Sequence, residues 1–258
     1  MSRPRQFRSR RGLWLRRLLP AALLRPARWL RDRLTPQGRT RRWLETNQSA
    51  QLLQPSPLTW ADRHPQLFAL ARDRLGANSA LRVLSFGCST GEEALTLAQY
   101  LPGARIDAVD INPRSIAQAQ RAQARVGNTS VHFACAGEPP HERAVYDAIF
   151  CLSVLRHGEL DAERPANCAQ ILPFARFAET IAAFDRGLKP GGLLFLWGSN
   201  FRFADTTAAA RYRAVEVVGK KPNGGAVYGR DNGLIEGAAN AAFVFEKLSE
   251  EPGQVRAQ

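Results

Sequence analysis

The chain has 258 residues, a hydrophobic fraction of 45% and a formal net charge of +13. This length suits one domain with an extension, and no stretch approaches the roughly 20 apolar residues that a membrane-spanning helix needs. The charge is concentrated at one end, because residues 1–43 contain fourteen arginines, one acidic residue and no lysine. The rest of the chain is therefore neutral, and the basic isoelectric point describes the extension alone.

Residues 1–43 are expected to form short basic helical pieces, because prolines prevent one continuous helix. Leucines and arginines fall on opposite helical faces with moderate amphipathicity. Trp14, Trp29 and the leucines between the arginines favour an interfacial segment on an anionic membrane surface. Binding to nucleic acid and a partly disordered tail that packs on its own domain are the alternatives.

The four cysteines, Cys88, Cys135, Cys151 and Cys168, show no CxxC spacing. A chain of this length does not need disulfides, so we expect reduced thiols in a cytoplasmic protein, peripheral at the inner face of the membrane if the extension binds there. A metal site is conceivable near the strand ends, but small polarisable filler is the better interpretation, and we predict no metal.

Residues 44–58 are predicted to be a linker, because they are polar and contain prolines, and residues 59–258 to be the main domain. From Leu81 onward, apolar strand patterns alternate with helical periodicity, which predicts right-handed crossovers and a parallel sheet covered on both faces. The expected helices are 60–75, 92–100, 113–125 and 174–188. The expected strands are 81–86, 106–109, 131–134, 146–151 and 193–197, with 212–218 and 242–247 as candidates for the last two.

The strongest signal is RVLSFGCSTGEEALTLA, residues 82–98. Gly87 and Gly91 allow the backbone to approach a ligand closely, and Ser89 and Thr90 lie at a helix N-terminus whose free N–H groups favour an anion. Asp110 ends the next strand, where an acid binds ribose hydroxyls in doubly wound folds. A glycine turn that only packs strand on helix is the plain alternative, and the acid at this strand end argues against it.

The residues after the loop distinguish between two nucleotide cofactors. An NAD site favours G-x-G-x-x-G, with glycines spaced to admit a pyrophosphate. Here Glu92 and Glu93 follow Gly91 at once, which is unfavourable beside a pyrophosphate but tolerable beside a cationic ligand with an amino group and a sulfonium. We therefore expect S-adenosylmethionine, with S-adenosylhomocysteine as the product.

GCSTGEEALTLA resembles the nucleotide loop of the chemoreceptor glutamate methyltransferases, a branch of the class I, S-adenosylmethionine-dependent methyltransferases. YDAIFCLSVLRH is similar to their fourth-strand motif, and FAETIAAFDRGLKPGGLLFLWGSN to their last crossover helix, turn and fifth strand. Thr59 and Arg63 reproduce a T-x-x-x-R element that reaches the cofactor in that family. The chain has Ser153 where that family has asparagine and lacks its receptor-docking insertion, so the acceptor does not carry over.

The resemblance implies an α/β, doubly wound, seven-stranded sheet of order 3-2-1-4-5-7-6 with the final strand antiparallel. It implies a site in which the glycine loop wraps the methionine part of the cofactor and the loops after the next strands hold the nucleoside. The implied cofactor-binding residues are Thr59, Arg63, Gly87, Cys88, Ser89, Thr90, Gly91, Glu92, Glu93, Asp110, Ile111, Ala136, Gly137, Cys151, Ser153 and Val154.

The expected reaction is transfer of the sulfonium methyl to an unidentified acceptor, with a small molecule or lipid as the first expectation. Methylation of protein carboxyl groups or of RNA, and cofactor binding without catalysis, are the alternatives. His157 lies just beyond the fourth strand, where it could act as a general base or could equally cap a helix or a lid. The segment 157–173 is the candidate lid over the acceptor.

Overall fold

The computed structural model describes residues 34–48, 51–56, 58–76, 80–222 and 224–249. The chain divides into two compact units, 1–47 and 48–258. In the first unit, helix α3 (Pro36–Asn47) begins at a proline, as the sequence suggests, and continues four residues past the expected end of the extension at residue 43. The other expectations for the extension concern residues 1–33, which lie outside the described part of the chain. None of the helices described is long and apolar enough to cross a membrane.

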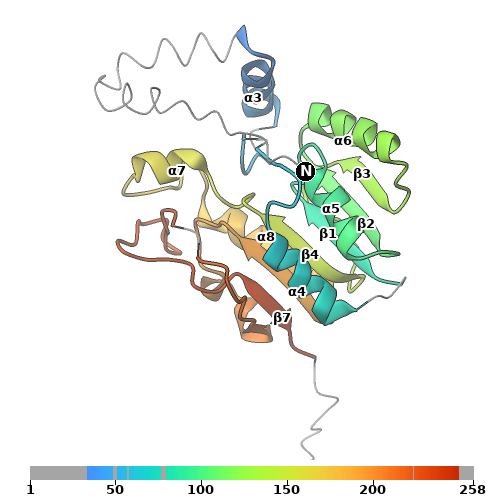
Figure 1. The fold of residues 1–258 in the computed structure, drawn as a ribbon. Coiled ribbons are helices and arrows are strands. Elements are labelled where there is room, and N and C mark those ends of the chain that lie inside the picture. The colour runs from blue at the N-terminus through green and yellow to red at the C-terminus, as the bar shows by residue number, and fades with distance from the viewer. Residues whose placement is uncertain (1–33, 49–50, 57, 77–79, 223, 250–258) are drawn as a thin grey trace, which may run out of the picture. The chain divides into compact units, whose positions relative to one another are not determined.

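The second unit is a seven-stranded sheet of order β3-β2-β1-β4-β5-β7-β6, with helices packed against it (Figure 1). The first five strands pair in parallel, and β7 runs antiparallel to both of its neighbours. This confirms the predicted class I methyltransferase fold. The strands are β1 (Arg82–Phe86), β2 (Arg105–Asp110), β3 (Val131–Cys135), β4 (Tyr146–Leu152), β5 (Leu188–Trp197), β6 (Tyr212–Ala214) and β7 (Val244–Lys247). The helices are α4 (Pro65–Leu75), α5 (Glu92–Tyr100), α6 (Pro113–Val126), α7 (Gly158–Glu163) and α8 (Phe174–Gly187), with short 3₁₀ turns η1 (Phe203–Asp205) and η2 (Ala209–Arg211).

Local sequence signals explain why the helices start and stop where they do. In α6 the side chain of Asn112 accepts a hydrogen bond from the backbone N–H of Arg114, and Pro113 occupies the first turn. The helix ends at Gly127, whose left-handed φ of 63° ends it without steric cost.

Alternating side chains of the central strands belong to two separate hydrophobic layers, one on each face of the sheet. On β1, Val83 belongs to the layer under α4 and α5, and the next residue, Leu84, belongs to the layer under α8. Because β4 shows the same alternation at Ile149 and Phe150, the sheet is buried on both faces. Because β1 to β5 are parallel, their carboxyl ends form one edge of the sheet, and the loops of the candidate site lie there.

Several segments differ from expectation. Helix α4 begins at Pro65 instead of residue 60, and β6 ends at Ala214 instead of residue 218. Strand β5 begins at Leu188 instead of residue 193, because the backbone of Leu188 already pairs with Tyr146 before a register shift. The sequence suggests a lid over 157–173, but Leu160, Cys168 and Leu172 within it are fully buried in the core. This segment therefore forms part of the packed domain.

Candidate functional site

The glycine loop turns sharply between β1 and α5. Gly87, Ser89 and Gly91 have positive φ angles of 76°, 51° and 91°. A side chain at Gly87 would meet Val154, because its Cβ would lie 2.3 Å from the Cγ2 atom of Val154. The loop is thereby packed against the residues that follow β4, so the ends of β1 and β4 share one boundary of the site.

Asp110 joins this loop to the end of β2. Its two carboxylate oxygens accept hydrogen bonds from the backbone N–H groups of Ser89 and Asn112, both at 2.8 Å. Burial raises the pKa of this carboxyl, while the two backbone hydrogen bonds oppose the shift. A carboxylate offers about four acceptor positions, so two remain for a pair of ribose hydroxyls. The predicted nucleoside role of Asp110 fits this geometry.

The two glutamates after the loop have different partners. Glu92 accepts a hydrogen bond from the hydroxyl of Thr90 at 2.6 Å, and Glu93 accepts one from Ser85 at 2.8 Å. Burial raises the pKa of Glu93 to about 7, although the Ser85 hydrogen bond and the charge of Arg63 act in the opposite direction. The carboxyl of Glu93 is therefore harder to ionise than that of an ordinary glutamate.

The segment before α4 carries Thr59 and Arg63, the two residues of the T-x-x-x-R element. Arg63 stacks over the ring of Trp60 at 4.6 Å, and its guanidinium donates a hydrogen bond to the carbonyl of Leu58. Earlier in the segment, the side chain of Gln54 donates to the carbonyl of Arg156. Thr59 is half-buried. The charge of Arg63 acts on Glu93, which follows the glycine loop, and the reach of Thr59 and Arg63 to the cofactor stays a prediction.

The expected adenine side lies where β2 and β3 end. The backbone N–H of Ala136 donates to the carbonyl of Asp110 at 3.0 Å. A Cβ on Gly137 would lie 2.6 Å from Oε1 of Gln51 and 3.0 Å from Cδ1 of Ile111. Gln51 therefore packs on this side of the site, although nothing in its sequence context singled it out.

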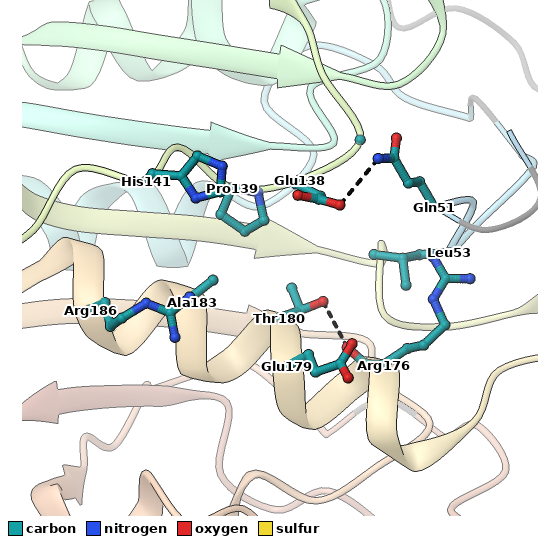
Figure 2. A pocket seen from close by; sticks show the side chains of 11 residues that line it. Gln51, Leu53, Glu138, Pro139, His141, Arg176, Glu179, Thr180, Ala183 and Arg186 are labelled. Carbon is teal, nitrogen blue, oxygen red and sulfur yellow. Dashed lines mark hydrogen bonds between the residues drawn. The ribbon is translucent and has the colours of Figure 1, made fainter.

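A groove of about 240 Å³ continues from Gly137 along α8 (Figure 2). It lies beside the connection between β3 and β4, in which the structure has no helix. Figure 2 shows Gln51 hydrogen-bonded to Glu138 on one side and Arg176, Glu179 and Arg186 of α8 on the other. Neither the glycine loop nor Asp110 lines it, so we regard it as a side groove and not as the centre of the site.

The residues after β4 complete the edge. Ser153 has a left-handed φ of 64°, and its backbone N–H donates to the carbonyl of Trp197 at 2.6 Å. Its hydroxyl is buried and, within the described part of the chain, has no hydrogen-bond partner. The thiols of Cys88 and Cys151 are buried, which raises the pKa of both, so their side chains act as apolar filler. Among the residues that the structure describes, no group of three His, Cys, Asp or Glu side chains could hold a metal.

His157 caps α7. Its Nδ1 accepts a hydrogen bond from the backbone N–H of Glu159 at 3.3 Å, and its own backbone N–H donates to Asn200 at 2.7 Å. In the neutral ring this contact uses the lone pair of Nδ1, which is the nitrogen that faces the first turn of α7. This geometry favours the capping role, and the catalytic role of His157 stays a prediction.

Three residues that the sequence did not single out gather at the end of β5. The rings of His64 and Trp197 have centroids 4.5 Å apart, and Nζ of Lys220 lies 3.0 Å from Nδ1 of His64. The one sequence feature that could have drawn attention to His64 is its position directly after the T-x-x-x-R element. Lys220 lies 156 positions further along the chain, so only tertiary structure brings it here.

Comparison with known proteins agrees with this geometry. Residues 84–194 match the family model described as a methyltransferase domain. The match covers less than half of the chain, and it agrees with the class I fold and with the loop-and-acid geometry.

Among individual relatives, the chain is 31% identical over 165 residues to the ubiquinone biosynthesis O-methyltransferase of Methylocella silvestris, covering 63% of this chain and 57% of the relative. It is 40% identical over 100 residues to the probable biofilm formation methyltransferase WspC of Pseudomonas putida, covering 31% and 24%. A solved structure of phosphoethanolamine N-methyltransferase 2 from Haemonchus contortus, in complex with S-adenosylmethionine, is 17% identical with a TM-score of 0.41, covering 60% of this chain and 34% of that one.

The chain spans less than two thirds of the length of both curated relatives. None of these three proteins is named as a chemoreceptor glutamate methyltransferase. The names agree with the predicted methyltransferase class, and the narrower resemblance to the chemoreceptor branch receives no support from them.

Proposed function

We propose that this protein transfers a methyl group from S-adenosylmethionine to a small-molecule acceptor. The observation that carries the proposal is the carboxylate of Asp110, which is fixed by two backbone N–H groups beside the left-handed glycine loop. The likeness to a ubiquinone biosynthesis O-methyltransferase supports a small acceptor.

The chain's own residues would position the reactants. Bound S-adenosylmethionine supplies a methyl group that its sulfonium already activates. The glycine loop would hold the methionine part, Asp110 the ribose hydroxyls, and Ile111, Ala136 and Gly137 the adenine. The acceptor's lone pair would displace the sulfur in line, so that the new methyl bond forms as the old one breaks and a neutral thioether leaves. The proton of a hydroxyl or amine acceptor would pass to solvent. Orientation and exclusion of water then supply most of the rate, without an obligatory general base.

Methylation of a protein carboxyl group is the second candidate. The resemblance of the GCSTGEE loop to the chemoreceptor glutamate methyltransferases favours it. Incubation with radiolabelled S-adenosylmethionine and fractionated extract separates the candidates, because label in organic extract supports a small acceptor. Base-labile label in protein supports the second candidate.

The cofactor site has a direct test. Full-length protein should bind S-adenosylhomocysteine in calorimetry, and Asp110→Ala should weaken binding by about 1–3 kcal/mol, the cost of a lost charge-assisted hydrogen bond. Asp110→Asn, which keeps the shape of the side chain, guards against an effect of misfolding. Glu163→Ala removes an exposed carboxylate and serves as the control with unchanged affinity. Failure of the full-length protein to bind S-adenosylhomocysteine would refute the proposed function.

A further inference from the structure

Exposed apolar side chains of the second unit gather at one end of the sheet. Among the residues described there, five large apolar side chains are exposed, namely Leu58, Trp60, Val126, Val218 and Leu248. Val126 ends α6 shortly before β3 starts, and Leu248 follows β7, whose antiparallel pairing brings its end beside the start of β5. The remaining three belong to two segments, 58–64 and 217–221, which meet at the opposite end of the sheet.

Contacts with the last residue of β5 join these two segments. The ring of His64 packs against Trp197 with a centroid distance of 4.5 Å, and Nζ of Lys220 lies 4.7 Å from the centroid of the same indole. Nζ of Lys220 also lies 3.0 Å from Nδ1 of His64. The segments therefore adjoin at the carboxyl edge of the sheet, the edge to which the glycine loop belongs.

A tight turn holds Val218 in solvent. The backbone N–H of Lys220 donates to the carbonyl of Val217 at 3.4 Å, and Gly219 between them has a φ of 75°. A positive φ at the second central position is typical of a type II turn, so Val218 occupies the first central position. Turn corners favour polar residues, and β-branched side chains favour strands. Val218 is 86% exposed and gains nothing from the fold, which favours a contact outside the domain.

Cationic side chains accompany the exposed apolar ones. Arg63 stacks over the ring of Trp60 at 4.6 Å, and its guanidinium donates to the carbonyl of Leu58 at 2.9 Å. Trp60 is 44% exposed in spite of this contact. Lys220 is half-buried, and its neighbour Lys221 is exposed. Each apolar segment thus carries its own positive charge.

The balance of charge and the type of side chain favour a membrane surface as the partner. Asp62 and Glu216 are the acidic residues beside the three cations, and Asp62 already accepts a hydrogen bond from Tyr100 at 3.2 Å. An exposed tryptophan and aliphatic side chains among lysines and arginines are typical of proteins that lie at a lipid interface. There the apolar side chains enter the headgroup region and the cations contact lipid phosphates.

We propose that Leu58, Trp60 and Val218 dock on an anionic membrane, and that the cationic side chains beside them contact the lipid phosphates. Three apolar side chains are too few to hold the protein there alone, so the extension would tether the protein and this docking surface would orient it. The carboxyl ends of the strands then face the bilayer, and an amphiphilic acceptor would enter from that side. This consequence rests on the proposed function, whereas the docking itself does not.

The test compares two labelled positions on full-length protein. Cys135 is the exposed thiol and the other three cysteines are buried, so Cys135→Ser provides the background. Val218→Cys and, in a second protein, Val126→Cys are labelled with nitrobenzoxadiazole, whose emission brightens and shifts to the blue in an apolar environment. Vesicles that contain phosphatidylserine should brighten the label at position 218 by about twofold or more, and should leave the label at position 126 unchanged. Both proteins keep the extension, and flotation with the same vesicles measures how much of each is bound.

Variants at the other segment test whether the docking surface acts as a unit. Leu58→Ser combined with Trp60→Ser should raise the lipid concentration for half of the response at position 218 by about tenfold. Leu248→Ser, which removes an exposed apolar side chain at the opposite end of the sheet, should leave that concentration unchanged.

Three results would overturn the docking surface. They are equal responses at positions 218 and 126, no response at position 218, and protein that does not float. A blue-shifted emission at position 218 before vesicles are added would also overturn it, because another part of the chain would then cover the turn. S-adenosylhomocysteine binding is measured in the same samples, and its loss would count against the proposed function and not against the docking.

Discussion

Glu93 is a partly buried carboxyl group whose ionisation should be visible in the stability of the protein. Its pKa is raised from 4.5 to about 7, chiefly by burial. Between these values the folded protein holds a proton that the unfolded chain has released, so the free energy of unfolding falls as pH rises through this window. Glu93→Gln should remove that fall and stabilise the protein above pH 7 by on the order of 1–3 kcal/mol.

Thermal unfolding from pH 4.5 to pH 8 measures this effect, and at this chain length each kcal/mol corresponds to about 2–4 °C in Tm. Glu92→Gln makes the same change in charge at the adjacent position and is the control. An equal pH slope in wild type and Glu93→Gln would show that Glu93 is ionised throughout.

The residues that could be predicted from sequence are those whose role depends on a local motif. The positions from Gly87 to Gly91 and Asp110 follow from a strand, a glycine turn and the end of the next strand, so the chain order alone places them together. His64 and Lys220 could not be found in this way, because their contact joins distant segments across the end of β5. Gln51 was missed for the same reason, since it reaches Glu138 over 87 positions.

Within the glycine loop, the contact between Gly87 and Val154 should set the position of the turn after β1. Gly87 and Gly191 both have a φ of 76°, but a Cβ at Gly191 would meet nothing within 4 Å. Gly191→Ala should therefore cost only the strain of the left-handed backbone, about 1–2 kcal/mol. Gly87→Ala adds a clash with Val154 and should cost about 1–3 kcal/mol more.

Urea unfolding of the two single variants measures the difference, and Gly87→Ala combined with Val154→Ala should recover part of it. Equal losses of stability in Gly87→Ala and Gly191→Ala would mean that Val154 moves aside freely. In that case the loop is not positioned by the residues after β4.

The order of the elements was predictable because each strand is an apolar run that ends in a turn or a functional loop, and each crossover has helical periodicity. The strand order and the antiparallel β7 came from the resemblance to class I methyltransferases and are confirmed. Helix α7 was missed because six residues are too few for periodicity to register. The start of β5 was missed because the sequence LKPGG is typical of a turn that precedes a strand. In the structure, Leu188 already pairs with β4.

For the whole molecule, the division of charge between the extension and the main domain is the feature that remains to be explained. Residues 1–43 carry the net charge of +13, and their tryptophans and leucines suit the interface of an anionic membrane. The boundaries of the extension, linker and main domain, at residues 43 and 58, stay predictions. The binding of the extension to a membrane surface is also a prediction.

Flotation with liposomes tests this prediction on the full-length protein. The protein should float with vesicles that contain phosphatidylserine at low salt, and less at high salt, because ions screen the attraction. Neutral phosphatidylcholine vesicles should recover little of it. Deletion of residues 1–43 should abolish flotation while S-adenosylhomocysteine binding persists, since the predicted cofactor residues all lie beyond the deletion. Full-length protein that stays at the bottom of the gradient but shifts RNA at physiological salt would contradict the membrane prediction and favour nucleic acid as the partner of the extension.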